Sequence, residues 1–146
     1  IAWGTMIDSE DELAMIDRAG DVLPDDAVVL GEPVNGSPYL LSRSGVQVVF
    51  PQLTPIAGSP ERLLLSERFN IWYLDPDVCQ AVRDLGVTHV YVDDLTFEEG
   101  GKWEESTQGL RVISTNRPGF ELVDEGGQAS IWRFTGCDGT LGAPAR

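Results

Sequence analysis

Histidine and metal-binding cysteine patterns are almost absent from this chain. Among 146 residues there is one histidine, and the two cysteines form no Cys-x-x-Cys pair. Zinc sites of the usual kinds need four clustered Cys or His ligands, so the sequence predicts none and no cofactor. His89 lies within an expected strand, where a satisfied core or edge histidine is favoured over a general base or metal ligand.

Basic residues are also scarce. The chain has 10 Lys and Arg against 24 Asp and Glu, a formal charge of -14. Such a charge repels polyanions, which argues against non-specific binding of nucleic acid or of an anionic membrane. We interpret the excess as a solubilising surface in preference to a cation-binding device.

Long apolar runs are missing as well. No stretch approaches the roughly 20 residues that span a bilayer, and Ile1-Ala-Trp-Gly begins no charged-then-apolar signal pattern. Without repeats or a low-complexity linker, residues 1–146 are expected to form one soluble domain, with an ordered core over about 9–137 and a loose tail at 138–146. The abrupt start and the tail suggest a piece of a longer protein.

The clearest structural signal present is the stretch 75–93. Asp75 suits a helix N-cap, Pro76 the first helical position and Gly86 a left-handed stop. Residues 87–92 follow as a short apolar run, typical of a strand covered on both faces. The stretch therefore predicts a capped helix that leads into a buried strand.

Similar signals punctuate the rest of the chain. We expect helices after Ser9, with Glu12 completing a capping box and Gly20 as the stop, after Ser37-Pro38, ended by Gly45, and after Ser59-Pro60. Expected strands cover 27–30, 46–50 and an edge strand at 110–114; 96–108 is expected to be a mobile acidic excursion. Residues 120–123 and 129–134 predict an antiparallel hairpin around a turn at 124–128.

These elements predict the fold class. Helix-to-strand passages followed by a hairpin favour a small three-layer α/β/α domain with a mixed, mainly parallel sheet that ends in an antiparallel hairpin. In such sheets ligands usually bind outside the carboxyl ends of the strands. We therefore expect any site in the loops after Leu30 and Phe50 and at Asp93-Asp94.

The chemical motifs at these places are weak. Gly31-Glu-Pro-Val-Asn-Gly-Ser lacks the glycine spacing of a phosphate loop, and Glu32 would repel a phosphate, so we reject a nucleotide site. Asp93 and Asp94, with the glutamates near 98–105, have no calcium-loop spacing, and a solvated acidic face is favoured over a calcium site or a hydrolase carboxylate pair. Trp72, Tyr73 and Trp103 are suited to stacking on sugars, although a core role is favoured.

The two cysteines leave two alternatives of equal weight. Cys79 lies on the expected helix at 76–85, and Cys137 follows the last expected strand. They form either a disulfide, if the compartment is oxidising, or two unrelated buried thiols.

Four runs carry a family resemblance: Val28-Val-Leu-Gly-Glu-Pro-Val-Asn-Gly-Ser, Tyr39-Leu-Leu-Ser-Arg-Ser-Gly-Val-Gln-Val-Val-Phe-Pro, the whole of 75–93, and 119–137. Their order resembles the C-terminal domain of a family of actinobacterial polytopic membrane proteins of unknown function. That family is similar to membrane glycosyltransferases of the C superfamily, which use lipid-phosphate-linked sugars and carry a globular domain outside the cytoplasmic membrane.

The resemblance implies an extracytoplasmic, membrane-anchored parent, and it favours the Cys79–Cys137 disulfide. The catalytic carboxylate of enzymatic relatives lies between transmembrane helices, so no catalytic residue is expected here. Asn35-Gly36-Ser37 matches the family's strand-to-helix turn and is an interaction candidate, although helix capping by Asn35 or Ser37 is favoured.

The leading functional hypothesis is a non-catalytic accessory domain in cell-envelope glycan assembly. Its expected partners are the transmembrane part of its own parent chain and a cell-wall glycan or lipid-linked sugar. Two alternatives stay open: a free-standing carbohydrate or cation module that uses Trp72 and Tyr73, and an independent hydrolase that uses Asp93 and Asp94.

Overall fold

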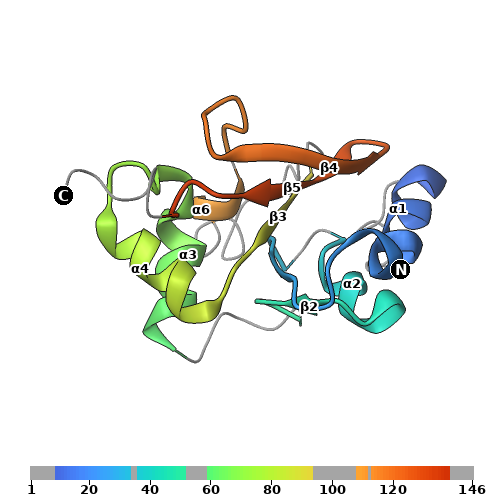
Figure 1. The fold of residues 1–146 in the computed structure, drawn as a ribbon, viewed down its shortest axis with the longest axis horizontal. Coiled ribbons are helices and arrows are strands. Elements are labelled where there is room, and N and C mark those ends of the chain that lie inside the picture. Colours follow the sequence, from blue (N-terminus) through green and yellow to red (C-terminus); the bar gives the residue numbers. More distant parts are fainter. Residues whose placement is uncertain (1–8, 34–35, 52–58, 94–107, 112, 139–146) are drawn as a thin grey trace.

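A computed structural model describes residues 9–33, 36–51, 59–93, 108–111 and 113–138 (Figure 1). The elements in chain order are α1 (Glu10–Val22), β1 (Val28–Leu30), α2 (Pro38–Ser44), β2 (Gln47–Val48), α3 (Pro60–Arg68), the 3-10 helix η2 (Phe69–Ile71), α4 (Pro76–Leu85), β3 (His89–Asp93), α6 (Gln108–Arg111), β4 (Phe120–Gly126) and β5 (Ala129–Phe134).

The strands form one open sheet in the order β2-β1-β3-β5-β4. β1 is parallel to β2 and β3, whereas β5 is antiparallel to β3 and β4. β5 alone therefore runs against the other four strands, and the predicted mixed, mainly parallel sheet with a terminal hairpin is confirmed.

Helices cover both faces of the sheet, with α3 and α4 on one side and α1 and α2 on the other (Figure 1). Alternate strand residues divide between two cores: Leu30, Val90 and Phe134 pack with the α3–α4 side, and Val29 and Tyr91 with the α1–α2 side. This period-two division follows from the pleat of a strand buried on both faces. The predicted three-layer arrangement is thus present.

The predicted caps set most helix bounds. The side chains of Ser59 and Asp75 accept hydrogen bonds from the backbone N–H groups of Arg62 and Asp77 at the starts of α3 and α4. Gly45 and Gly86 end α2 and α4 at a φ of 70°, where only glycine avoids a steric penalty.

Gly20 does not end the first helix, contrary to prediction. α1 continues to Val22, and a Cβ at Gly20 would lie 2.9 Å from the carbonyl oxygen of Ser44. The glycine is needed for close packing of α1 against α2, whose Ser44 hydroxyl donates to the carbonyl of Ile16.

The predicted edge strand at 110–114 is also wrong. Residues 108–111 form the short helix α6, and Leu110 is buried in the core. A Cβ at Gly109 would lie 2.4 Å from the backbone nitrogen of Arg68, so glycine lets α6 pack directly against the end of α3. A propensity-based reading cannot detect this tertiary contact.

Three smaller differences concern the strands. β2 spans two residues where five were expected, and β4 extends through Asp124 and Glu125 with a bulge between Leu122 and Asp124. The hairpin turn is correspondingly shorter, with Gly127 at a φ of 63°. The expected excursion at 96–108 lies almost wholly outside the described residues, as do Trp103 and 139–146 of the expected tail.

Among the described residues, no helix has the length and apolarity required to cross a bilayer.

Candidate functional site

The carboxyl ends of β1 and β3 meet at the topological switch point of the sheet. The chain leaves β1 through α2 on one face and returns from β2 to β3 through α3 and α4 on the other. Ligands of open α/β sheets usually bind at such a point. Here it is formed by a buried set, the switch-point cluster: Glu12, Glu32, Gly36, Ser37 and Tyr91.

Glu12 and Tyr91 form the centre of the cluster. The Tyr91 hydroxyl donates a hydrogen bond to the Glu12 carboxylate, and the two side chains are 1% and 0% exposed. Glu12 belongs to the first turn of α1, where the Ser9 hydroxyl accepts from its backbone N–H at 3.1 Å. The Ser9 cap was predicted, whereas the contact between Glu12 and the middle of the sheet was not.

Two glycines allow this close packing. A Cβ at Gly36 would lie 2.5 Å from Glu12 Oε2 and 2.6 Å from the Tyr91 hydroxyl oxygen. A Cβ at Gly31 would lie 2.6 Å from the Ser37 Oγ. The strand-to-helix turn therefore closes directly over the Glu12–Tyr91 pair, and only glycine fits there.

Ser37 does not cap α2, so that part of the favoured capping interpretation is wrong. Its backbone is already helical at φ -59° and ψ -35°, and its side chain makes no capping hydrogen bond. The hydroxyl instead donates to the carbonyl oxygen of Glu32 at 3.1 Å, which closes the turn on itself. Asn35, the other proposed cap, lies outside the described residues.

The predicted ligand-binding residues are only partly brought together. Gly36 and Ser37 lie in the cluster, and Asp93 ends β3 two residues beyond Tyr91; Asp94 lies outside the described residues. Within the described ranges, no three acidic, His or Cys side chains are placed to hold a metal ion. A binding role for Gly36, Ser37 and Asp93 stays a prediction.

Sequence reasoning missed Glu32 and Tyr91 and gave Glu12 only a capping role. Each looks ordinary in sequence: a glutamate in a turn, an aromatic in a strand and a capping-box glutamate. A glycine at 36 that is not the stop of a helix was the one available sign of a close approach.

Trp72 and Tyr73 lie at the opposite end of the strands. Trp72 is 8% exposed and contacts Phe134 edge to face at a centroid distance of 5.1 Å. The backbone N–H of Phe134 donates to the carbonyl oxygen of Thr88, at the amino end of β3. Trp72 is therefore a core residue, remote from Asp93, whereas Tyr73 is 41% exposed beneath the guanidinium of Arg117.

Cys79 and Cys137 form a disulfide, with their Cα atoms 5.2 Å apart. Arg83 on α4 donates to the carbonyl oxygen of Cys137 at 3.0 Å. Gly136 lies against Trp72, since a Cβ there would be 2.5 Å from the indole ring. Of the two alternatives open in the sequence, the disulfide is confirmed, and it ties the end of β5 to α4.

His89 is a core histidine, as expected. It is 3% exposed, and its Nδ1 lies 2.7 Å from the Thr88 hydroxyl. Burial, with a smaller contribution from the charge of Arg133, lowers the pKa of His89 below its ordinary value. The imidazole is therefore neutral at pH 7.

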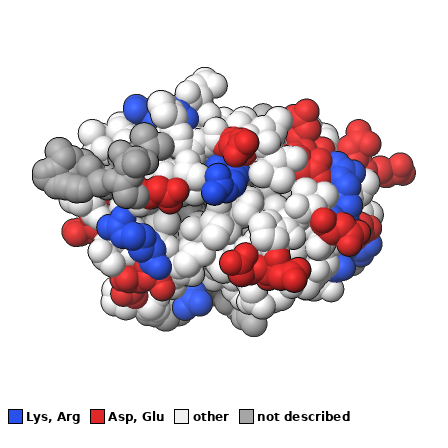
Figure 2. Space-filling model, viewed as in Figure 1, with Lys and Arg blue, Asp and Glu red and all other residues white. Residues whose placement is uncertain are grey.

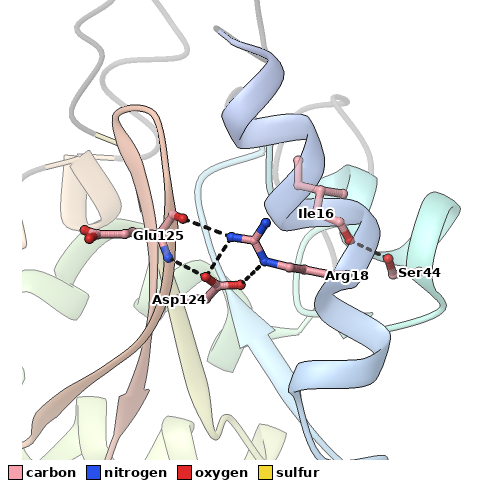
Figure 3. Close-up of polar contacts among 5 residues, drawn as sticks. All are labelled: Ile16, Arg18, Ser44, Asp124 and Glu125. Atoms are coloured by element: carbon pink, nitrogen blue, oxygen red, sulfur yellow. Dashed lines mark hydrogen bonds and ion pairs between the residues drawn. The ribbon is translucent and has the colours of Figure 1, made fainter.

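An ion pair joins α1 to the hairpin (Figure 3). Arg18 donates to both carboxylate oxygens of Asp124, at 2.7 and 2.8 Å, and to the carbonyl oxygen of Glu125. The Arg18 hydrogen bonds lower the pKa of Asp124. This contact joins α1, the helix that carries Glu12, to β4.

Charge is unevenly distributed over the face drawn in Figure 2. Figure 2 shows acidic side chains most numerous at the right-hand end, where α1 and its glutamates and aspartates lie. The excess of acidic residues in the sequence therefore comes partly from α1.

The fold is similar to that of a globular domain of known structure. The chain is similar to the crystal structure of the C-terminal globular domain of an oligosaccharyltransferase from Archaeoglobus fulgidus, with a TM-score of 0.55 and 16% identity over 86% of this chain and 97% of that domain. At this identity the likeness concerns the fold. Residues 1–136 match the model of DUF6541, a family of unknown function, and the chain belongs to that family. The comparison with curated proteins gave no match.

Proposed function

We propose that this chain is a non-catalytic, extracytoplasmic accessory domain of a glycosyltransferase-like membrane protein of the bacterial cell envelope. The observation that carries the proposal is the fold likeness, which spans 97% of a domain that is itself the C-terminal globular part of an oligosaccharyltransferase. A fold likeness over nearly a whole domain supports a corresponding position for this chain, as a globular part of a larger membrane protein.

The disulfide supports the extracytoplasmic part of the proposal. Disulfides persist in oxidising compartments and are rare in the cytosol, where thiols are kept reduced. The Cys79–Cys137 bond is buried and joins two elements that a reduced protein would hold by packing alone.

The buried polar groups of the switch-point cluster are engaged in contacts within the domain, which favours an accessory role. Glu12 is bound by Tyr91, Ser37 is bound to the Glu32 backbone, and His89 is buried beside Thr88. The first two contacts stabilise the strand-to-helix turn, and the Thr88 hydroxyl beside His89 donates to the carbonyl oxygen of Val28. The role is then to position an acceptor glycan, a partner or the transmembrane part of the parent chain.

The two other functional hypotheses receive less support. Burial of Trp72 removes one of the two aromatic rings that a carbohydrate module would use, and Arg117 covers one face of Tyr73. Asp94, the second carboxylate of the hydrolase hypothesis, lies outside the described residues, so that hypothesis stays a prediction.

The parent gene tests the proposal most directly. We expect about ten hydrophobic spans upstream of Ile1. We also expect an alkaline phosphatase fused to the chain to be active, because this enzyme is active only after export from the cytoplasm. A signal peptide as the only upstream hydrophobic segment, or a cytoplasmic location, contradicts it.

Titration with cell-wall glycan fragments tests the acceptor role. Shifts of the Gly36 and Ser37 amide resonances at millimolar glycan are expected if the turn over the switch-point cluster contacts the acceptor. If no amide resonance shifts, only the scaffold role is left.

A further inference from the structure

One arginine differs from the others in its environment. Five of the other arginines whose side chains are described donate to a carboxylate or a carbonyl oxygen, and Arg133 forms an ion pair with Glu121 at 3.8 Å. The five are Arg18, Arg43, Arg62, Arg68 and Arg83. Arg117 has neither kind of partner among the described residues, although the chain carries 24 acidic residues.

Arg117 is held by an aromatic ring instead. Its guanidinium carbon lies 3.3 Å from the centroid of the Tyr73 ring, a cation–π stack that fixes the planar group. Its N–H donors stay available at the rim of the plane, in the fork geometry that binds phosphate and carboxylate through two hydrogen bonds. A guanidinium held in this way is suited to bind an oxyanion.

An exposed apolar residue follows the stacked tyrosine in the chain. Leu74 follows Tyr73 in the turn between η2 and α4 and is 68% exposed, the highest value among the exposed large hydrophobic residues of the described part. Tyr73 is itself 41% exposed, with an apolar ring and a polar tip. An exposed leucine, a tyrosine and an arginine with free donors are the residue types that occupy the interface between a bilayer and water.

We propose that Tyr73, Leu74 and Arg117, the interfacial patch, rest against a lipid bilayer, with Arg117 bound to headgroup phosphates and Leu74 inserted at the acyl boundary. The patch lies at the amino end of β3, so the switch-point cluster at the other end of the strands faces away from the lipid. The proposal adds a bilayer contact to the proposed function and is tested on the chain itself, independently of what precedes it.

The charge of the whole chain dictates which lipids it prefers. A formal charge of -14 opposes approach to an anionic surface, whereas phosphatidylcholine carries the same phosphate without net charge. At low salt, binding to phosphatidylcholine vesicles is therefore expected to exceed binding to phosphatidylglycerol vesicles. Added salt screens the repulsion and narrows the difference.

Paramagnetic broadening by spin-labelled lipid in phosphatidylcholine vesicles gives the most local readout. The Leu74 methyl resonances are expected to broaden strongly, and those of Leu63, which is 45% exposed on α3, to change little. Equal broadening of both leucines, or none at millimolar lipid, overturns the proposal.

Matched variants complete the test. Arg117→Gln and Leu74→Ser are each expected to lower the vesicle-bound fraction at least fivefold. Arg133→Gln and Leu63→Ser remove the same groups from exposed positions elsewhere and are expected to leave the bound fraction unchanged. Equal loss in the control variants overturns the proposal.

Inorganic phosphate separates a bilayer from a soluble ligand. If phosphate alone shifts the Arg117 Nε–H resonance while vesicles do not broaden Leu74, the patch binds a soluble oxyanion and the bilayer contact is wrong. If both phosphate and vesicles give these effects, and phosphate displaces the protein from the vesicles, Arg117 binds the headgroup phosphate.

Discussion

At the scale of single residues, glycine decides how closely the elements approach. Gly36 has no left-handed backbone requirement, yet a Cβ there would overlap both Glu12 and Tyr91. The sequence marks the position only as part of a turn. Its steric role becomes visible when α1, far away in sequence, is placed over the sheet.

Gly36→Ala is therefore expected to destabilise the fold by about 1–3 kcal/mol, the usual cost of overpacking. Equilibrium denaturation in guanidinium chloride measures the change. In a Tyr91→Phe background one of the two clashing oxygens is gone, so the same substitution is expected to cost less. Equal costs in the two backgrounds would show that Gly36 does not act through Tyr91.

The Arg18–Asp124 pair gives a second prediction at this scale. The pKa of Asp124 is lowered in the folded state, chiefly by its hydrogen bonds to Arg18, so the pair stabilises the fold above the ordinary aspartate pKa of 3.8. This contribution is lost as the pH falls from about 4 through the lower folded-state value. Asp124→Asn is expected to cost about 1 kcal/mol at pH 7, and the difference from the unmodified protein shrinks below pH 4.

The exposed pair Arg43–Asp17 provides the control. Asp17→Asn is expected to have a smaller effect at pH 7, because both side chains of that pair are open to solvent. A pH-independent difference for Asp124→Asn would show that its cost comes from packing instead of charge.

At the scale of elements, local and distant contacts contribute differently. α4 begins at Asp75-Pro76 and ends at Gly86 as its sequence predicts, because caps act within a few residues. The attachment of β5 to α4 depends on Cys137, which is 58 residues from Cys79, and no local rule specifies it.

Removing the disulfide is expected to lower the free energy of unfolding by about 4 kcal/mol, the chain-entropy value for a loop of this length. Cys79→Ser/Cys137→Ser and the unmodified protein treated with dithiothreitol should show similar losses in guanidinium chloride. Dithiothreitol should not affect the double variant. A loss below about 1 kcal/mol would indicate that packing around Gly136 and Trp72 already holds the segment.

At the scale of the whole molecule, the acidic surface opposes the compact state. The described basic side chains are mostly committed to local pairs, so the remaining carboxylates repel one another. Sodium chloride raised from about 0.02 M to 0.5 M shortens the screening length to a few ångströms and weakens this repulsion.

The melting temperature is accordingly expected to rise by about 3–5 °C over that range of salt, which corresponds to about 1 kcal/mol for a chain of this size. Differential scanning calorimetry at pH 7 measures the rise, with an uncharged solute of matched osmolality as the control. A melting temperature that does not depend on salt would contradict the argument.

Sequence alone determined most of the helix caps, the hairpin, the class of the fold and the apolar strands, since these depend on neighbouring residues and on periodicity. Tertiary structure decided that 108–111 would be helical, that α1 would pass Gly20, that Glu12 would meet Tyr91 and that the cysteines would pair. It also separated Trp72 from Asp93 and placed Arg117 over the ring of Tyr73. In each case the deciding contact joins residues far apart in the chain, and its energy exists only after the layers have packed.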